Sequence, residues 1–440
     1  MKKNLRAGTS IIDISPELGV ELAGYPHYPR YNTGIHDPLY ASCIYLNDGI
    51  TKLAVVCMDL VMFSNKYADT VCNKIASKTD IPAKNIMITC SHTHSGPWAS
   101  GMLDLEALRD GSKPDEKYIE ELENKLVKLF IEAHNNNFNA KIGIEKGYCG
   151  KESGVGGNRR DPNGLADPEV WVIGVQDEES NWKACLVKYS LHPTVIHEGS
   201  TLVTADYPAY IRQKLSETKP GMTFLFAQGT SGNQSTRYFR SGQTFDEAKR
   251  IGTAIGSEAD RVLSSMKLSS DIELFVKSTE IDVEIRALPS RKEAEAHVIQ
   301  AKKKYEELKA VDAPYIEIQN AYLELLGAED TLGYVIHKEC GRKLELIEDE
   351  LPAEVQVIGI GDTRIVGLPG EIFVEFGLEI KDRSKYKNTF VIELANGCLP
   401  GYACTKEAYD VGGYEPGASI LTAQAGKALV EAALKLIEKT

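Results

Sequence analysis

The stretch Asn85-Ile-Met-Ile-Thr-Cys90 leads directly into Ser91-His-Thr-His-Ser-Gly-Pro97. Its largely apolar run predicts a buried β-strand of about six residues, which the Gly-Pro pair ends. Because side chains alternate between faces along an extended chain, His92 and His94 can lie on the same side of it. A single histidine is usually a satisfied core or surface residue. Two imidazoles on one side of a strand end are instead typical of a metal site.

Five further apolar segments end in the same manner, at polar or glycine-rich residues. They cover residues 53–58 before Asp59, 185–191 before His192, 223–227 before the loop 228–233, 363–368 before Pro369-Gly370-Glu371, and 390–395 before Asn396-Gly397. In α/β sheets, ligands bind outside the carboxyl ends of the strands. We therefore expect these segment ends to form one shared pocket.

The remaining segments predict helices around a sheet. Helical spacing of apolar residues marks residues 115–133, 245–266 and 421–438. The highly charged segment 288–332, broken near Pro314, predicts a helical hairpin inserted between strands, as a lid, an oligomer contact or a plain solvated excursion. The fold class expected for residues 1–440 is a single α/β domain with a layered mixed β-sheet core, flanking helices and this inserted hairpin.

The charge of the chain limits its partners. The formal net charge is −13, the pI is near 5.3, and no lysine–arginine block rises above the general scatter. Phosphate binding needs a basic face, so we expect no nucleic-acid partner. No apolar stretch approaches the roughly 18 residues that span a bilayer, which predicts no transmembrane segment. A homo-oligomer stays open.

The cysteines and the N-terminus predict a cytoplasmic protein. The nine cysteines are scattered, form no C-x-x-C pair, and fall partly inside apolar segments, as reduced thiols do. Residues 1–8 are basic but lack the apolar core of a secretory signal. A secreted protein whose leader has been removed is the alternative.

Several residue types needed for metal-assisted hydrolysis stand at the segment ends. Zinc hydrolases use nitrogen and oxygen ligands and keep one position for a water molecule. His92 and His192 supply nitrogens, and Glu371 supplies a carboxylate at the predicted start of a helix, where capping is its structural alternative. Tyr402 follows a strand end, where packing is the usual role. Arg159 lies in a glycine-rich loop, either as a surface residue or as a donor to a carbonyl or carboxylate.

Two motifs are specific enough to carry a family resemblance: Ser91-His-Thr-His-Ser-Gly-Pro97 and Leu368-Pro-Gly-Glu371. Supporting matches, in order along the chain, are Gly34-Ile-His-Asp-Pro-Leu-Tyr-Ala41, Asn158-Arg159, His192-Pro-Thr194, Gly232-Asn-Gln-Ser235, and Gly401-Tyr402 with Tyr414 beyond it. Over nearly its whole length, the chain resembles the catalytic N-terminal domain of the neutral/alkaline, non-lysosomal ceramidases. These are zinc-dependent amidases of sphingolipid metabolism that split the N-acyl bond of ceramide.

The resemblance implies a site residue by residue. Zinc would be held by four residues: His92, His192, Glu371 and Tyr402. The scissile amide would be surrounded by His94, Arg159, Tyr414 and the same Tyr402. The metal would activate a water molecule that attacks the N-acyl carbonyl, with His94 moving its proton to the leaving nitrogen.

The sequence also departs from this family. Neutral ceramidases carry a second, immunoglobulin-like domain, for which residues 1–440 leave no room, so we expect the catalytic domain only. Asn233 stands where those enzymes tend to have aspartate. The substrate expected from these differences is a ceramide-like or a smaller, more polar N-acyl compound or ester.

Other functions fit parts of the same sequence. Ser235 is a candidate nucleophile of a serine hydrolase or esterase, although it lies in no G-x-S-x-G elbow. A metal-dependent amidohydrolase barrel also begins with His-x-His on a strand. A homologue that binds a metal or ligand without turnover is the third alternative. A second cation, Ca²⁺ or Mg²⁺, could bind His36, Asp37 and Asp59, for which structural hydrogen bonding is the simpler role.

Overall fold

An eight-stranded mixed sheet forms the larger half of the core. The computed structural model describes residues 5–100, 115–340 and 350–440. The strand order is β11-β9-β8-β6-β1-β3-β4-β5, with parallel pairs only at the two edges, β11/β9 and β4/β5. These strands are β1 (Arg6–Asp13), β3 (Tyr40–Asn47), β4 (Lys52–Met58), β5 (Ile86–Cys90), β6 (Phe138–Tyr148), β8 (Glu169–Asp177), β9 (Trp182–Tyr189) and β11 (Thr223–Gln228).

A four-stranded sheet packs against the larger one. Its order is β13 (Leu274–Ile281), β14 (Ala353–Ile360), β15 (Thr363–Gly367) and β17 (Asn388–Ile392). Apolar side chains of both sheets share one core, in which the rings of Trp171 and Phe390 stack at 4.9 Å. This arrangement is a sandwich of two sheets, because each sheet buries its inner face against the other.

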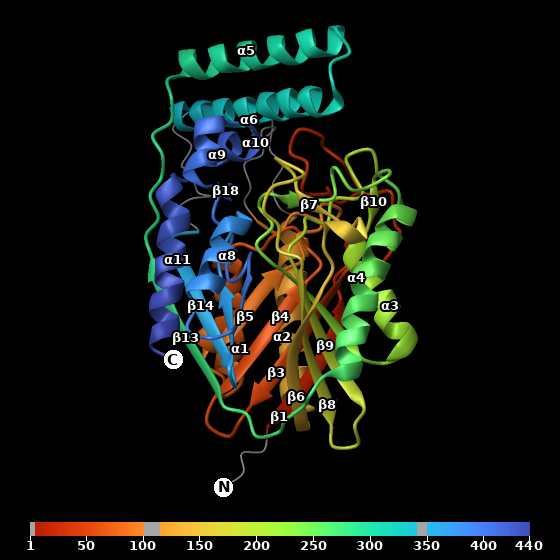
Figure 1. Cartoon of the computed structure of the whole chain (residues 1–440). Coiled ribbons are helices and arrows are strands. Elements are labelled where there is room, and N and C mark those ends of the chain that lie inside the picture. The colour runs from red at the N-terminus through yellow and green to blue at the C-terminus, as the bar shows by residue number, and fades with distance from the viewer. Residues whose placement is uncertain (1–4, 101–114, 341–349) are drawn as a thin grey trace.

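Helices cover the outer faces of the sandwich (Figure 1). On the large sheet they are α1 (Asn65–Lys78), α2 (Glu116–Asn135), α3 (Tyr207–Thr218) and α4 (Phe245–Ser265), and on the small sheet α8 (Val374–Arg383) and α11 (Ala423–Glu438). Local sequence sets their ends, since the Asp115 carboxylate accepts the Lys117 and Tyr118 amides and caps α2. The predicted α/β layers with flanking helices are confirmed. An open sandwich of this kind is not an amidohydrolase barrel.

The chain after β17 joins the two sheets at one end of the sandwich. The Asn396 amide donates to the Ile88 carbonyl of β5 at 2.8 Å, and the Glu393 amide donates to the Gln228 carbonyl of β11 at 2.9 Å. The carboxyl ends of β5, β11 and β17 therefore meet, as the sequence pattern predicts.

Short elements and a helical hairpin lie beyond these strand ends. Three two-residue ladders are β2 (Gly34–Ile35) with β10 (Leu202–Val203), β7 (Gly157–Asn158) with β12 (Gln234–Ser235), and β16 (Glu371–Ile372) with β18 (Tyr402–Ala403). The small helices of this end are η2 (Lys151–Ser153), α9 (Lys406–Val411) and α10 (Tyr414–Ala418), whereas η1 (Ala83–Asn85) directly precedes β5 at the opposite end of that strand. Above them, α5 (Arg291–Ala310) and α6 (Tyr315–Glu339) form the expected hairpin, whose second helix continues past residue 332 (Figure 1).

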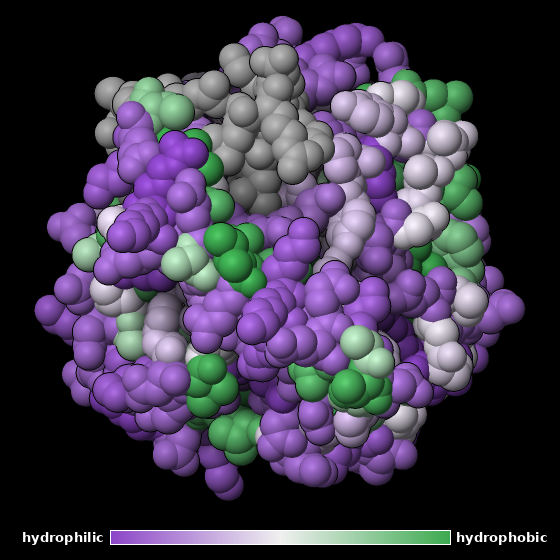
Figure 2. All heavy atoms as spheres, turned by 90° about the horizontal axis from the view of Figure 1, so that it is seen from above, coloured by the Kyte–Doolittle hydropathy of each residue, from purple (hydrophilic) through white to green (hydrophobic). Residues whose placement is uncertain are grey.

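The surface of this end is mostly hydrophilic. Seen from above, purple residues dominate the face and hydrophobic ones are scattered over it (Figure 2). Within residues 5–100, 115–340 and 350–440, no helix is both long enough and apolar enough to cross a membrane.

Candidate metal and substrate site

His92 and His94 meet ring to ring just beyond β5. The Nε2 atoms of the two imidazoles lie 3.2 Å apart. The pairing is as predicted, but its expected cause is wrong: β5 ends at Cys90, and His92 has φ +69° rather than extended backbone. A non-glycine residue in the left-handed region is uncommon, and such backbone concentrates at functional sites. The His92 Nδ1 lies 2.8 Å from the Val61 carbonyl, so that nitrogen donates and Nε2 is left for a ligand.

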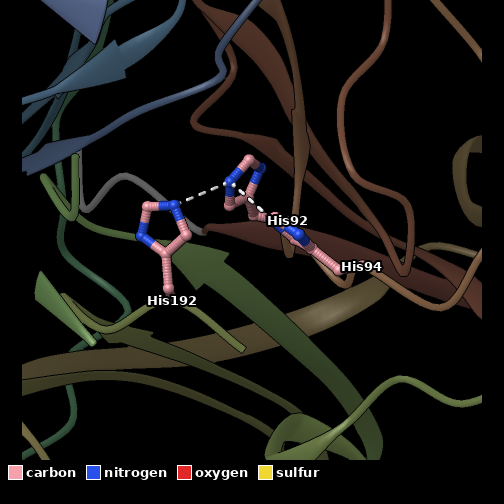
Figure 3. Close-up of side chains that lie close together, drawn as sticks. All are labelled: His92, His94 and His192. Atoms are coloured by element: carbon pink, nitrogen blue, oxygen red, sulfur yellow. Dashed lines mark hydrogen bonds between the residues drawn. The ribbon is translucent and has the colours of Figure 1, made fainter. Parts of the chain in front are cut away.

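His192 completes a group of three buried imidazoles (Figure 3). Its Nδ1 lies 2.8 Å from the Ser231 carbonyl, and its Nε2 lies 3.0 Å from the Nε2 of His92. Candidate ligand nitrogens of His92, His94 and His192 all lie within 4.8 Å of one another, close enough to hold a metal ion together. It is the only such group of histidine, cysteine or acidic residues in the described part of the chain.

The carboxylate of Glu371 points into the same group. Its Oε2 lies 3.1 Å from the His192 Nε2 and 3.2 Å from the His92 Nε2. Three ligands of one tetrahedral zinc, each bound at about 2.0–2.1 Å, would be separated by about 3.3 Å. The spacing of these three atoms therefore fits a shared metal ion. The capping interpretation of Glu371 is wrong, because the residue lies in β16 and α8 begins only at Val374.

Charges in this group depend on one another. Burial alone would raise the pKa of Glu371, but His92 and His192 outweigh it and hold that pKa well below the usual range. Burial alone would lower the pKa of His92, but the Glu371 carboxylate leaves it raised. Burial lowers the pKa of His192 to about 3 and holds that of His94 well below its usual value. His94 is thus a neutral imidazole, and its buried Nδ1 has no hydrogen-bond partner.

Tyr402 is held beside Glu371 by the backbone. The two residues are Cα partners in the parallel ladder of β16 and β18. The ring of Tyr402 lies 6.0 Å from that of Tyr414 and 5.3 Å from the guanidinium carbon of Arg159. Burial, reinforced by the Glu371 carboxylate, raises the pKa of the Tyr402 phenol well above its usual value. In the metal-free protein both Tyr402 and Tyr414, whose pKa burial also raises, are therefore neutral donors.

Arg159 is buried rather than part of an exposed surface loop. Its Nε donates to Glu415 Oε1 at 2.8 Å, and the neighbouring Arg160 donates to Glu415 Oε2 at 2.6 Å. Burial opposes ionisation of Glu415, but Arg159 and Arg160 prevail and lower its pKa to about 2. The Arg159 Nη2 is buried without a hydrogen-bond partner. This leaves one donor of a fixed cation free for another group.

One cavity of about 240 Å³ joins these residues. Six of the seven predicted site residues line it: His92, His94, Arg159, Glu371, Tyr402 and Tyr414. The seventh, His192, contacts His92 without lining the cavity itself. Helix α6 covers the cavity with Tyr315, Gln319 and Tyr322.

Sequence reasoning missed the residues that hold this site in place. Glu415 fixes Arg159, and Glu393 accepts hydrogen bonds from the Ser231 hydroxyl at 2.5 Å and the Ile372 amide at 2.8 Å. Glu393 thereby links Ser231, which bonds to His192, to Ile372, which follows Glu371 in the chain. No sequence motif marks either Glu415 or Glu393 as a site residue. Arg237 and Arg240, which also line the cavity, follow the Gly232-Asn-Gln-Ser235 loop and were recognisable as a pair of cations in an acidic chain.

Two other predicted centres remain: Ser235, which lines the same cavity, and the group of His36, Asp37 and Asp59. The Ser235 hydroxyl accepts a hydrogen bond from the Arg237 amide at 3.2 Å, and no imidazole in the described residues bonds to it, so a serine nucleophile would lack a base. Asp59 contacts Arg212 and the Tyr40 amide, and Asp37 accepts the Ala205 amide at 2.9 Å. These are structural hydrogen bonds.

The fold defines a class of layered α/β proteins that build a histidine-rich site at one end of a two-sheet sandwich. No protein-family model and no curated protein matches the sequence. Solved structures share the fold, among them two ceramidases. The neutral ceramidase from Pseudomonas aeruginosa matches with a TM-score of 0.74 and 19% sequence identity. The match covers 100% of this chain and 75% of the ceramidase chain. A ceramidase complexed with C2 has a TM-score of 0.72 and 17% identity, covering 99% and 76%. The chain thus has the neutral ceramidase fold that its sequence resemblance implies.

Proposed function

We propose that this protein is a zinc-dependent hydrolase that cleaves the N-acyl amide bond of a ceramide-like or smaller substrate. The observation that carries the proposal is the spacing of the His92 Nε2, His192 Nε2 and Glu371 Oε2 atoms, which lie 3.0–3.2 Å from one another. The shared fold with neutral ceramidases supports the reaction class. A cytoplasmic location, a part in sphingolipid metabolism and self-association remain predictions.

The metal would be held by His92, His192 and Glu371, with the phenol of Tyr402 as the fourth ligand. The backbone carbonyls of Val61 and Ser231 fix the Nδ1 protons of the two histidines, which keeps each Nε2 available. Bound zinc supplies a Lewis acid that polarises a carbonyl and lowers the pKa of water towards about 7.

His94 is proposed to move the proton. Its ring lies 4.8 Å from that of His92, it lines the cavity, and burial keeps it neutral, so that one ring nitrogen carries a free lone pair. A proton accepted there can be delivered to the leaving nitrogen. His94 is also close enough to be a metal ligand. The two roles differ in their prediction: His94→Ala keeps the metal if His94 is the base and loses it if His94 is a ligand.

Arg159 and Tyr414 are proposed to stabilise the charge that develops on the carbonyl oxygen, and Tyr402 does so when its phenol is protonated and not bound to the metal. The free Nη2 of Arg159 and the phenols of Tyr402 and Tyr414 all belong to side chains that line the cavity. Removing one donor of this kind typically costs about 2.7–4 kcal/mol of barrier. Glu415 holds Arg159 in position before the substrate arrives.

The experiment combines metal analysis with an amide substrate panel. The purified protein is expected to contain about one zinc per chain and to hydrolyse N-acyl amides, with both lost in His92→Ala. His297→Ala is the matched control, because His297 lies on the distant helix α5 with its side chain 51% exposed. Zinc without hydrolysis of any amide or ester would favour a binding homologue. Full zinc content and turnover in His92→Ala would refute the metal assignment, and chelator-insensitive turnover lost in Ser235→Ala would identify a serine enzyme.

A further inference from the structure

We infer that the substrate carries an anionic group beside the scissile amide, and that Arg237 and Arg240 bind it. The inference rests on the proposed function and specifies its substrate class. A carboxylate is the simplest such group, because the planar guanidinium matches it with two parallel hydrogen bonds.

Arg237 and Arg240 line the same cavity as the histidines. Arg237 Nη1 donates to the Arg159 carbonyl at 3.1 Å. Arg240 Nη1 donates to the Thr194 carbonyl at 2.5 Å, and its Nη2 donates to His197 Nε2 at 3.2 Å. Both guanidinium groups are therefore anchored by neutral acceptors on the wall of the cavity.

Neither arginine forms an ion pair with a carboxylate in the described part of the chain. Arg159 and Arg160 differ from them, because those two share Glu415. Glu198 of the cavity wall, whose charge acts on Arg240, is bound instead to His197 Nδ1 at 2.6 Å. The chain as a whole has a net charge of −13, so acidic residues outnumber basic ones. Two cations that line a cavity without a paired carboxylate are therefore unusual in this protein.

The electrostatics show what these cations lack. Burial lowers the pKa of both Arg237 and Arg240, and the nearby Arg159 cation lowers that of Arg237 further. Glu415 opposes this shift at Arg237, and Asp206 and Glu198 oppose it at Arg240, but burial outweighs them. A largely buried charge without a directly paired carboxylate is costly. A bound anion would remove this cost, so its binding is favoured over that of a neutral group of the same shape.

The location puts the anion close to the reaction centre. Arg237 borders both the cavity of about 240 Å³ and a neighbouring one of about 490 Å³, and so does Arg159, whose carbonyl it holds. Ligand pockets for drug-sized molecules usually measure about 300–1,000 Å³, so the smaller cavity suits a compact polar amide better than a two-chain lipid. N-acylated amino acids and monoamides of dicarboxylic acids both have this chemistry.

The test compares charged and uncharged partners of one substrate. The probes are N-hexanoylglycine and its uncharged counterpart N-hexanoylglycinamide, with the N-propyl monoamide of succinic acid as a second arm that moves the carboxylate to the acyl side. We expect the zinc-loaded protein to prefer one charged probe in kcat/KM by at least about tenfold over its uncharged counterpart. The preference should fall to about twofold or less in Arg237→Gln and Arg240→Gln. Arg250→Gln is the control, since Arg250 pairs with Glu247 on α4 and does not line the cavity.

Each outcome decides the inference separately from the proposed function. Equal turnover of charged and uncharged probes overturns the anion site and leaves the amidase intact. A preference that survives both arginine variants also overturns it, because the carboxylate would then bind the metal. If no probe is hydrolysed, the proposed function is decided by the wider amide and ester panel, and the anion site by binding alone. Calorimetric binding of N-hexanoylglycine, weakened at least about tenfold in Arg237→Gln and not in Arg250→Gln, would still support the anion site, and equal binding would overturn it.

Discussion

The imidazole of His94 packs directly on the backbone of Gly24. A Cβ atom built on Gly24 would lie 2.4 Å from the His94 Cγ and 2.6 Å from its Nδ1. Gly24 has φ +95°, where a side chain is disfavoured in any case. The loop before β2 thus forms one wall of the site, and the position of His94 depends on a missing side chain.

Replacing Gly24 with alanine should displace His94 and lower kcat/KM for amide hydrolysis by at least about tenfold, since displacements of about 1 Å can cost a hundredfold. Gly49→Ala is a matched control: Gly49 has φ +90°, but its Cβ would meet no atom within 4 Å. Both variants place a side chain at a φ near +90°, where backbone strain of about 1–2 kcal/mol is expected. Equal activity in the two variants would show that the ring of His94 is not needed where it lies.

Zinc should stabilise the folded chain. A ligand that binds only the folded state at a hundred times its Kd adds about 2.7 kcal/mol to the free energy of unfolding. The Tm of the metal-free protein should therefore rise on titration with zinc, and this rise should be absent in His192→Ala. The His297→Ala control should behave like the unaltered protein. A zinc-induced rise of the same size in His192→Ala would place the metal elsewhere.

Glu415 should make stability sensitive to acid. Its folded-state pKa is lowered to about 2 by Arg159 and Arg160, against about 4.3 in an unfolded chain. The stabilisation is therefore complete above about pH 4.3 and is lost as the pH falls towards 2. The free energy of unfolding of Glu415→Gln should be lower at pH 6, and the difference from the unaltered protein should shrink between pH 5 and about 3. A pH-independent difference would contradict the linkage.

A buried ion cluster below the site should also be essential to stability. Asp167 accepts from Lys188 at 2.8 Å and from Lys381 at 2.9 Å, and the side chains of Asp167 and Lys188 are 2% and 1% exposed. Asp167→Asn leaves Lys188 buried without its counter-charge, which should cost about 3–5 kcal/mol in urea unfolding. Asp410→Asn breaks the exposed pair with Lys406 and should cost at most about 1 kcal/mol. Similar losses in both variants would show that burial of the cluster contributes nothing.

The strands and their shared end were predictable from the sequence. The apolar segment 86–90 coincides with β5, and the ends of β4, β9, β11, β15 and β17 lie within a few residues of the predicted positions. Buried strands leave a strong local pattern, because both of their faces must be apolar. The motifs around His92 and Glu371 follow such strands, and for this reason the sequence could place them near one cavity.

The remaining features depend on contacts between distant segments. The positive φ of His92 comes from its bonds to the Leu60 and Val61 carbonyls, which no local pattern encodes. Glu415 is an ordinary acidic residue until folding brings Arg159 to it, 256 positions away. Helix α6 runs to Glu339, past the hairpin end expected at residue 332.

The inserted hairpin leaves and rejoins the sandwich between neighbouring strands. Ile281 and Ala353, at the two ends of this excursion, are direct partners in the antiparallel pair of β13 and β14. The register of the sheet therefore continues directly across the insertion that roofs the cavity. Helix α6 also holds α10 from above, because the Tyr334 hydroxyl donates to the Ala418 carbonyl and the Thr331 hydroxyl donates to the Gly417 carbonyl. An exchange of the roof, by evolution or by a protein engineer, would thus alter the wall that carries Tyr414 together with the molecules admitted.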